Sequence, residues 1–288
     1  MRDNVIRLAV FGLTGAGKSS LVVHATGTPL EIGHGGDSCT EEVQPAQLRV
    51  GLKRVIFFDT PGFDDTQSRD PEIFEKISAW LAESRAHGKC LNGVILVQPV
   101  NNVRVPDSER QRTRLFKNII GDQFYDRVAI VTTMWDKIDD SFGEQNERNR
   151  ASDYSLWGDM LAKGAKVIRF QNDKPSALEV ARHFANNASM SSPATMLLQY
   201  ELEAYDGQLS NTSAAKQFEI DLGNKVTELE FSIKKVGGSR PKLEEQLKNL
   251  QTWRSRLRDT LMRIGNGMVE TVGMAGNIFE IATSCASM

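Results

Sequence analysis

Cysteine is rare in this sequence of 288 residues, and its three cysteines, Cys39, Cys90 and Cys285, are far apart and form no C-x-x-C pair. An odd number of isolated cysteines argues against a disulfide framework or a zinc site and favours reduced thiols. Net charge is also small, −2 at pH 7, so no overall field attracts nucleic acid or acidic lipid. The sequence lacks an apolar signal segment at Met1 and any run of about 18 apolar residues that could span a bilayer. We therefore expect a soluble, cytoplasmic protein that does not bind nucleic acid.

What the sequence does contain is a phosphate-binding motif, G-x-x-x-x-G-K-S, at residues 12–19. Apolar runs on both sides of it predict a strand, a loop and a helix. In this arrangement backbone N–H groups surround a phosphate at the positive end of the helix, Lys18 reaches the β- and γ-phosphates as the candidate catalytic residue, and the Ser19 hydroxyl coordinates Mg²⁺. The alternative is a glycine-rich turn with an idle lysine. The residues expected to bind the phosphates are Gly12, Leu13, Thr14, Gly15, Ala16, Gly17, Lys18, Ser19 and Ser20.

A D-x-x-G sequence, from Asp59 to Gly62, follows the β-branched run at residues 54–58. A carboxylate at the end of a strand beside the phosphate loop can hold Mg²⁺ through water, and the Gly62 N–H can bond the γ-phosphate. The four residues also fit an ordinary turn. Together with Lys18 upstream, they predict a switch that responds to the nucleotide.

The segment between these motifs, residues 32–40, is rich in glycine and suits a loop that reorders. Thr40 is our candidate for the hydroxyl that joins Mg²⁺ in the triphosphate state, and the alternative is a surface-loop threonine. The expected metal ligands are therefore Ser19, Thr40 and Asp59.

A base-recognition element follows the apolar run at residues 128–131. Thr133 and Asp136 stand where an N-K-x-D or T-K-x-D sequence is expected, and Met134 replaces the lysine that covers the base. The Asp136 carboxylate can accept from the N1–H and the N2 amino group of guanine, a pairing that adenine lacks, and a thioether can pack on the ring. A strand-end aspartate that caps a turn is the alternative. Asn172 is a further candidate for bonding the base.

Short β-branched runs alternate with amphipathic stretches over residues 5–188, which predicts an α/β domain whose mostly parallel sheet is flanked by helices. We place this domain at residues 1–190 and a helical extension at residues 191–288. The predicted strands are 5–11, 47–52, 54–58, 93–97, 127–132 and 166–169. The predicted helices are 18–25, 71–85, 106–120, 144–162 and 176–186, two of which open with proline.

In the extension, apolar residues step by three and four from 222 to 236, and the stepping resumes from 243 to 268. A Gly-Gly turn at 237–241 separates the two stretches, which predicts an antiparallel helical hairpin. Two arrangements stay open. The hairpin packs back on the sheet domain, or it forms a dimerising coiled coil.

These elements, in this order over residues 5–185, resemble the septin-like GTPases, which include the GIMAP proteins and the chloroplast import Toc receptors, and above all the GIMAP-like G domains of fungi. The resemblance rests on residues 12–19, 38–40, 59–62 and 133–136. It implies a P-loop GTPase fold of the TRAFAC class, GTP or GDP and Mg²⁺ as ligands, and nucleotide-dependent pairing of G domains. It also implies an interface or charge-stabilising role for Arg104, for which a solvated arginine is the alternative.

Phe63 follows Gly62 where many signalling GTPases carry a glutamine that orients water. Hydrolysis is therefore expected to be slow, or to take a polar group from Asp64, Asp65 or a second protomer. The leading hypothesis is a Mg²⁺-dependent GTP-binding protein that hydrolyses GTP slowly and passes its nucleotide state to the helical extension or a second subunit. An ATPase of similar build, which Met134 allows, and a scaffold with permanently bound nucleotide are the alternatives.

The last four residues, 285–288, fit the C-a-a-X pattern for farnesylation. The alternative is a free thiol, because Ser287 is a poor aliphatic substitute and no polybasic stretch precedes the pattern. We expect membrane association only if Cys285 is lipidated.

Overall fold

The structure, a computed structural model of the chain, describes residues 4–30, 42–63, 70–102, 104–236 and 241–259. It is built around a six-stranded sheet with the order β2-β3-β1-β4-β5-β6. β2 pairs antiparallel with β3, and every other neighbouring pair is parallel. The strands are β1 (Val5–Gly12), β2 (Gln44–Val50), β3 (Lys53–Asp59), β4 (Gly93–Pro99), β5 (Val128–Thr133) and β6 (Lys166–Arg169). Because parallel strands end at one edge of a sheet, the loops after β1, β3, β5 and β6 meet there.

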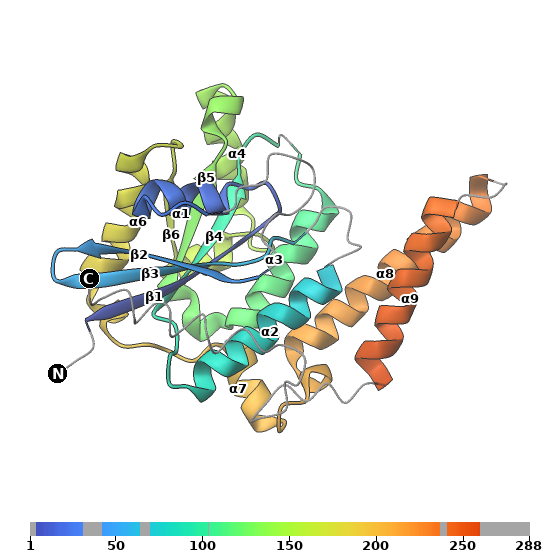
Figure 1. The fold of residues 1–288 in the computed structure, drawn as a ribbon. Helices are drawn as coiled ribbons and strands as arrows, with labels where there is room; N and C mark the ends of the chain where they lie inside the picture. The colour runs from blue at the N-terminus through green and yellow to red at the C-terminus, as the bar shows by residue number, and fades with distance from the viewer. Residues whose placement is uncertain (1–3, 31–41, 64–69, 103, 237–240, 260–288) are drawn as a thin grey trace.

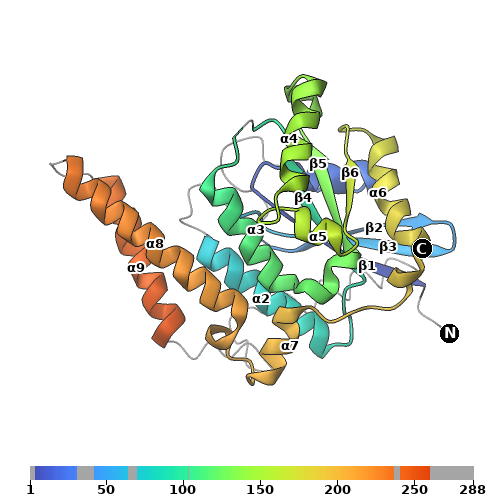
Figure 2. The ribbon, with the colours of Figure 1, turned by 180° about the vertical axis from the view of Figure 1, so that it is seen from behind.

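Helices cover both faces of the sheet (Figures 1 and 2). One face carries α1 (Lys18–Thr26) and α6 (Lys174–Asn186). The other carries α2 (Asp70–Ala86), α3 (Asp107–Ile120) and α7 (Leu197–Ala204). The remaining helices are α4 (Asp140–Ser152), α5 (Gly158–Ala162), α8 (Ser213–Val236) and α9 (Pro241–Asp259). None of the helices within the described ranges is both long and apolar enough to cross a membrane.

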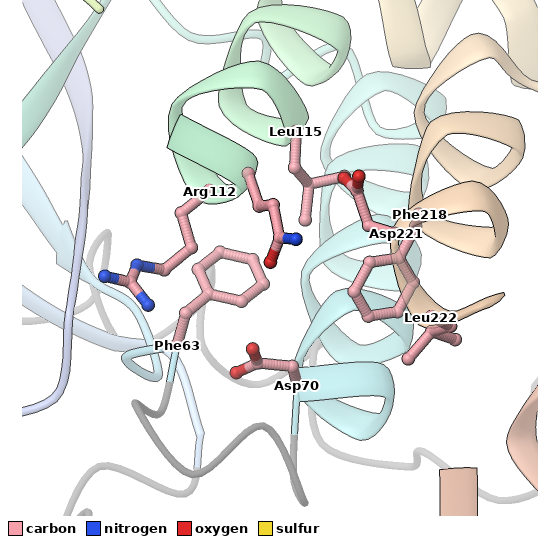
Figure 3. A pocket seen from close by; sticks show the side chains of 8 residues that line it. Phe63, Asp70, Arg112, Leu115, Phe218, Asp221 and Leu222 are labelled. Atoms are coloured by element: carbon pink, nitrogen blue, oxygen red, sulfur yellow. The ribbon is translucent and has the colours of Figure 1, made fainter. Parts of the chain in front are cut away.

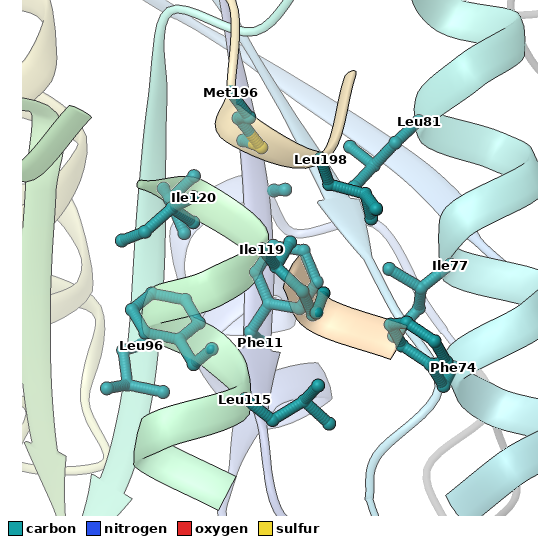
Figure 4. Packing of buried hydrophobic residues seen from close by; sticks show 14 of the residues in the cluster. Phe11, Phe74, Ile77, Leu81, Leu96, Leu115, Ile119, Ile120, Met196 and Leu198 are labelled. Carbon is teal, nitrogen blue, oxygen red and sulfur yellow. The ribbon is translucent and has the colours of Figure 1, made fainter. Parts of the chain in front are cut away.

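β1 illustrates why the central strands are apolar on both sides. Ile6, Leu8 and Val10 belong to the core under α1 and α6, whereas Ala9 and Phe11 belong to the core under α2 and α3. Successive side chains of a strand point to opposite faces, so a strand covered on both sides needs apolar residues at nearly every position. In the second core, side chains of β1, β4, α2, α3 and α7 converge (Figure 4).

The helices after α6 extend this second core. α8 packs along α3, and its buried Phe218, Leu222 and Val226 belong to the same cluster as the sheet residues. α9 returns beside α8, with Glu230 near Gln251 and Gly223 against Arg254, so the two helices are antiparallel. The predicted hairpin is confirmed, and it packs on the sheet domain. The predicted turn at 237–241 lies outside the described residues except for its last position.

One predicted helix, 144–162, is wrong in extent because the chain forms two helices there, α4 and α5. Asp153 ends the first helix: its carboxylate accepts from the Ser155 N–H at 2.8 Å, and its carbonyl accepts from the Gly158 N–H at 3.0 Å. An aspartate that bonds the backbone two residues on competes with the helical pattern. The chain turns there before α5 begins.

Other differences lie at the ends of elements. β2 begins at Gln44 and not at residue 47, because pairing with β3 continues past Pro45, which an edge strand tolerates. Pro106 is the N-cap residue before α3 and not its first helical residue. These shifts leave the order of the elements as predicted.

Candidate functional site

The phosphate loop joins the end of β1 to the start of α1, in the middle of the sheet edge. Gly17 is the N-cap residue of α1, with φ of 95°, and no side chain caps this helix end. A side chain at Gly17 would be strained in this left-handed conformation. The N–H groups of the first helical turn are therefore left for an anion, which the positive helix end also attracts.

Lys18 lies inside this loop. Its side-chain Nζ donates to the Leu13 carbonyl at 2.9 Å, and the residue is only 6% exposed. Burial lowers the pKa of Lys18 to about 8, and the negative charge of Asp59 acts in the opposite direction. The ammonium group is thus partly desolvated, which strengthens its attraction to a phosphate group.

Asp59 and Ser19 meet beside Lys18, as the D-x-x-G interpretation predicts. The Ser19 hydroxyl donates to Oδ2 of Asp59 at 2.6 Å, and Asp59 is fully buried. Burial raises the pKa of Asp59, although Lys18 and the Ser19 hydroxyl lower it. The other carboxylate oxygen, Oδ1, is buried and has no hydrogen-bond partner among the described residues.

The oxygen atoms of Ser19 and Asp59 are suitable ligands for Mg²⁺. The ion prefers six oxygen ligands and is usually held by one or two carboxylates, waters and phosphate oxygens. In the described part of the chain, no three His, Cys, Asp or Glu side chains gather in a metal-binding group. A hydroxyl and one orphaned carboxylate oxygen therefore suit an ion that shares its ligands with a nucleotide.

The D-x-x-G loop lies directly on the phosphate loop. The Thr14 N–H donates to the Phe63 carbonyl at 2.8 Å, and the Thr14 hydroxyl donates to the Gly62 carbonyl at 3.2 Å. A Cβ at Gly62 would lie 2.5 Å from Nζ of Lys18 and 2.6 Å from the Thr14 nitrogen. Only glycine fits this approach, so the loop contacts the lysine through its backbone.

The base-recognition element is tied to the phosphate loop from the other side. The Thr133 hydroxyl donates to the Ala16 carbonyl at 2.8 Å. Met134 follows with φ of 64°, a left-handed conformation that is uncommon for a residue with a Cβ. Asp136 has a half-exposed carboxylate, whose Oδ2 lies 3.2 Å from Nζ of Lys137. The carboxylate is accessible, as base recognition requires.

Asn172 lies between β6 and α6 and also has a positive φ, of 56°. The Ser20 hydroxyl donates to its side-chain Oδ1 at 2.8 Å. The structure thus brings these two predicted site residues together. The contact joins the first turn of α1 to the loop after the last strand.

Residues 7–131 match the family described as 50S ribosome-binding GTPase. The N-terminal part of the chain contains a P-loop GTPase domain. The curated relative GTP-binding protein A of Dictyostelium discoideum is 26% identical to the chain over 152 residues, which are 50% of this chain and 32% of that protein. The chain therefore spans about a third of the length of this relative.

A solved structure of low identity shares the fold of the GTPase domain. It comes from a study of dimerization and GTPase activity in the chloroplast translocon components atToc33 and psToc159. Its sequence is 14% identical to this chain. The match covers 67% of this chain and 86% of that chain, with a TM-score of 0.50. Toc33 from Arabidopsis thaliana in complex with GDP and Mg²⁺ is 16% identical, over 59% of this chain and 72% of that chain, with a TM-score of 0.49.

For some of the predicted residues, the expected role stays a prediction. Thr40, the expected third metal ligand, lies outside the described residues, as do Asp64, Asp65 and Cys285. Arg104 is exposed in the segment between β4 and α3. Its predicted role in an interface stays a prediction.

Two features of the GTPase domain were missed from the sequence. Phe63 is 7% exposed and packs in the apolar core. Trp135, within the base-recognition element, is also buried, and the guanidinium of Arg169 lies over its ring. The aromatic Trp135 next to Asp136 is visible in the sequence, but its partner Arg169 on β6 is 34 positions away in the chain.

Proposed function

We propose that this protein binds GTP together with Mg²⁺, hydrolyses it slowly, and passes its nucleotide state to the α8–α9 hairpin or to a second subunit. The observation that carries the proposal is the pair of opposite charges buried at the start of α1 and at the end of β3. Lys18 and Asp59 are both desolvated, the charge of each influences the pKa of the other, and Asp59 keeps one orphaned oxygen. A buried arrangement of this kind is completed by a polyphosphate and a cation.

Each group has a defined task in this proposal. Lys18 and the backbone N–H groups at the start of α1 bind the β- and γ-phosphates. Ser19 and Asp59, with Thr40, hold Mg²⁺, which when bound neutralises charge on the phosphate oxygens. The Gly62 N–H bonds the γ-phosphate while that group is present.

Guanine selectivity is assigned to Asp136. Its half-exposed carboxylate can accept two hydrogen bonds from one guanine edge, which adenine cannot supply. The relative named GTP-binding protein A supports this choice. The contact between Ser20 and Asn172 keeps the last loop close to α1, where it can border the base.

The placement of Phe63 supports slow hydrolysis. Its side chain lines a cavity of about 30 Å³ together with residues of α3 and α8 (Figure 3). An apolar ring that is buried in this direction can neither polarise nor orient a water molecule at the phosphate. A second protomer could supply the missing group, with Arg104 as the proposed contributor, within the septin-like class that the sequence resembles.

The same placement provides a route to the hairpin. Phe63 follows Gly62, the proposed γ-phosphate sensor, and shares its cavity with Phe218 and Leu222 of α8. The rings of Phe218 and Phe74 of α2 lie 5.1 Å apart. Any displacement of Gly62 therefore changes packing against α8, because well-packed interiors transmit strain.

Calorimetry with GTP, GDP and ATP in the presence of Mg²⁺ tests the binding proposal. We expect guanine nucleotides to bind and Lys18→Ala to remove that binding, whereas Lys163→Ala, an exposed lysine paired with Asp122, leaves it unchanged. Equal affinity for ATP would contradict guanine selectivity. Phosphate release measured together with light scattering then separates a slow monomer from a pairing-activated enzyme, and no release at any protein concentration would favour the scaffold.

A further inference from the structure

The turn that carries Asp136 is anchored from behind by a buried aromatic ring. Trp135 is 4% exposed, and its Nε1–H lies 3.2 Å from both the carbonyl and the hydroxyl oxygen of Thr132. The preceding Met134 has the positive φ of 64°. Such a conformation in a residue other than glycine costs about 1–3 kcal/mol and persists only where neighbouring contacts hold it.

A cation covers this ring. The guanidinium carbon of Arg169 lies 4.4 Å from the centre of the Trp135 ring. Arg169 is the last residue of β6 and is the register partner of Thr132 on β5. A guanidinium at this distance is attracted by the face of the indole, which is the best aromatic partner for a cation.

Two carboxylates of α4 hold the guanidinium in place. Nη2 of Arg169 lies 2.8 Å from Oε1 of Glu147, and Nη1 lies 3.1 Å from Oε1 of Glu144. Glu147 also accepts from the Thr132 hydroxyl at 3.1 Å. The fixed planar fork of arginine suits this arrangement, in which one face meets a ring and the edges meet carboxylates.

Helix α4 approaches the other part of the ring closely. At Gly143, an added Cβ would lie 2.8 Å from Cζ3 and 3.1 Å from Cε3 of Trp135. The helix can therefore seat against the indole only with glycine at this position. Trp135 is enclosed by β5, β6 and α4, while its neighbour Asp136 stays half exposed.

We propose that Arg169 and Trp135 are specificity-positioning residues, which fix the Asp136 carboxylate in the orientation that reads the guanine N1–H and N2 amino groups together. This inference rests on the proposed guanine binding. Two hydrogen bonds from one carboxylate to one base edge require a narrow range of orientations, and pre-organisation lowers the cost of reaching it. Arg169 contacts no part of the base in this scheme and acts through Trp135.

The test compares binding of GDP and inosine diphosphate, which lacks the N2 amino group. In Arg169→Met we expect affinity for GDP to fall about 10-fold and affinity for inosine diphosphate to fall less than about 3-fold, so the ratio of the two decreases. Asp136→Ala is the reference for complete loss, because it should remove most of the discrimination between GDP and inosine diphosphate. Adding Arg169→Met to Asp136→Ala should then change the ratio little, since the two residues act as one unit.

Arg110→Met is the matched control. Arg110 pairs with Asp153 at 2.7 Å, and its side chain is 38% exposed against 40% for Arg169. We expect the control to keep the ratio of wild-type protein. Trp135→Phe, which retains an aromatic face for the cation, should keep more discrimination than Arg169→Met does.

The outcomes distinguish this inference from the proposed function. Wild-type protein that prefers GDP, with an unchanged ratio in Arg169→Met, would overturn the positioning role alone. An equal loss of affinity for both nucleotides would do the same, because a merely structural role lowers both. Wild-type protein that binds neither nucleotide would overturn the guanine-binding proposal and the positioning role with it.

Discussion

Replacing Phe63 by glutamine tests the account of hydrolysis most directly. The substitution supplies the amide that many signalling GTPases use to orient water. Here the side chain at position 63 lies between α3 and α8, so we expect no rate increase and a loss of stability. Removing a buried phenylalanine costs about 2 kcal/mol in transfer free energy, and the space that the smaller glutamine leaves in the core costs about 1 kcal/mol more. The free energy of unfolding should therefore fall by about 3 kcal/mol.

Thermal unfolding and single-turnover phosphate release measure the two effects. For a chain of this size, a loss of about 3 kcal/mol lowers Tm by roughly 6–12 °C. The GTP hydrolysis rate at 20 °C, where the variant is still folded, should stay within about 3-fold of that of wild-type protein. Nucleotide affinity should change little, because Phe63 contributes its backbone and not its side chain to the phosphate loop.

A surface phenylalanine provides the control. Phe231 on α8 is 66% exposed, so Phe231→Gln should change stability by less than about 0.5 kcal/mol. If Phe63→Gln instead keeps the wild-type Tm and hydrolyses GTP at least about 10-fold faster, the side chain points to the nucleotide. The assigned burial of Phe63, and the route to the hairpin that depends on it, would then be wrong.

Three further predictions concern buried charge and close approach. The pKa of Lys18 is lowered to about 8 from 10.5, so the unfolded state binds more protons than the folded state between these values. The free energy of unfolding of the nucleotide-free protein should therefore rise by on the order of 3 kcal/mol as pH rises through that window. Denaturant titrations at pH 7.5 and 10 should show this increase, and Lys18→Met should lack it. Gly62→Ala should displace the loop from Thr14 and reduce the preference for triphosphate over diphosphate, measured by calorimetry. Arg150→Met should destabilise by about 3–5 kcal/mol in urea unfolding, because it leaves the buried Glu109 carboxylate without its ion-pair partner at 2.7 Å; a smaller loss in Arg150→Met with Glu109→Gln would confirm that cause.

The phosphate side of the site could be predicted from the sequence because its chemistry is local. The glycines and the Lys-Ser pair of residues 12–19 are enough to predict a phosphate loop between a strand and a helix. Asp59 ends the neighbouring strand. The contact between Ser19 and Asp59 followed from two motifs that the sheet brings to one edge. Strand order itself was not predicted.

Long-range packing could not be predicted in the same way. The sequence showed that Phe63 cannot orient water, but not that its ring lines the same cavity as Phe218, which lies 155 positions later. Trp135 and Arg169 are separated by 34 positions and by two helices, α4 and α5. Periodicity identifies the buried face of an element and not the element that covers it.

The buried charges link nucleotide binding to the stability of the whole fold. Lys18 and Asp59 are held where burial disfavours the charged form of each, and the pKa shifts of the two residues are opposite in direction for that reason. A phosphate beside the ammonium and a cation beside the carboxylate relieve both costs at once. A ligand that binds only the folded state raises its stability in proportion to RT ln(1 + [L]/Kd), so nucleotide should stabilise this chain strongly at concentrations far above Kd. The core beneath the site is continuous from β1 to α8, and that stabilisation should therefore extend to α8 as well as to the sheet.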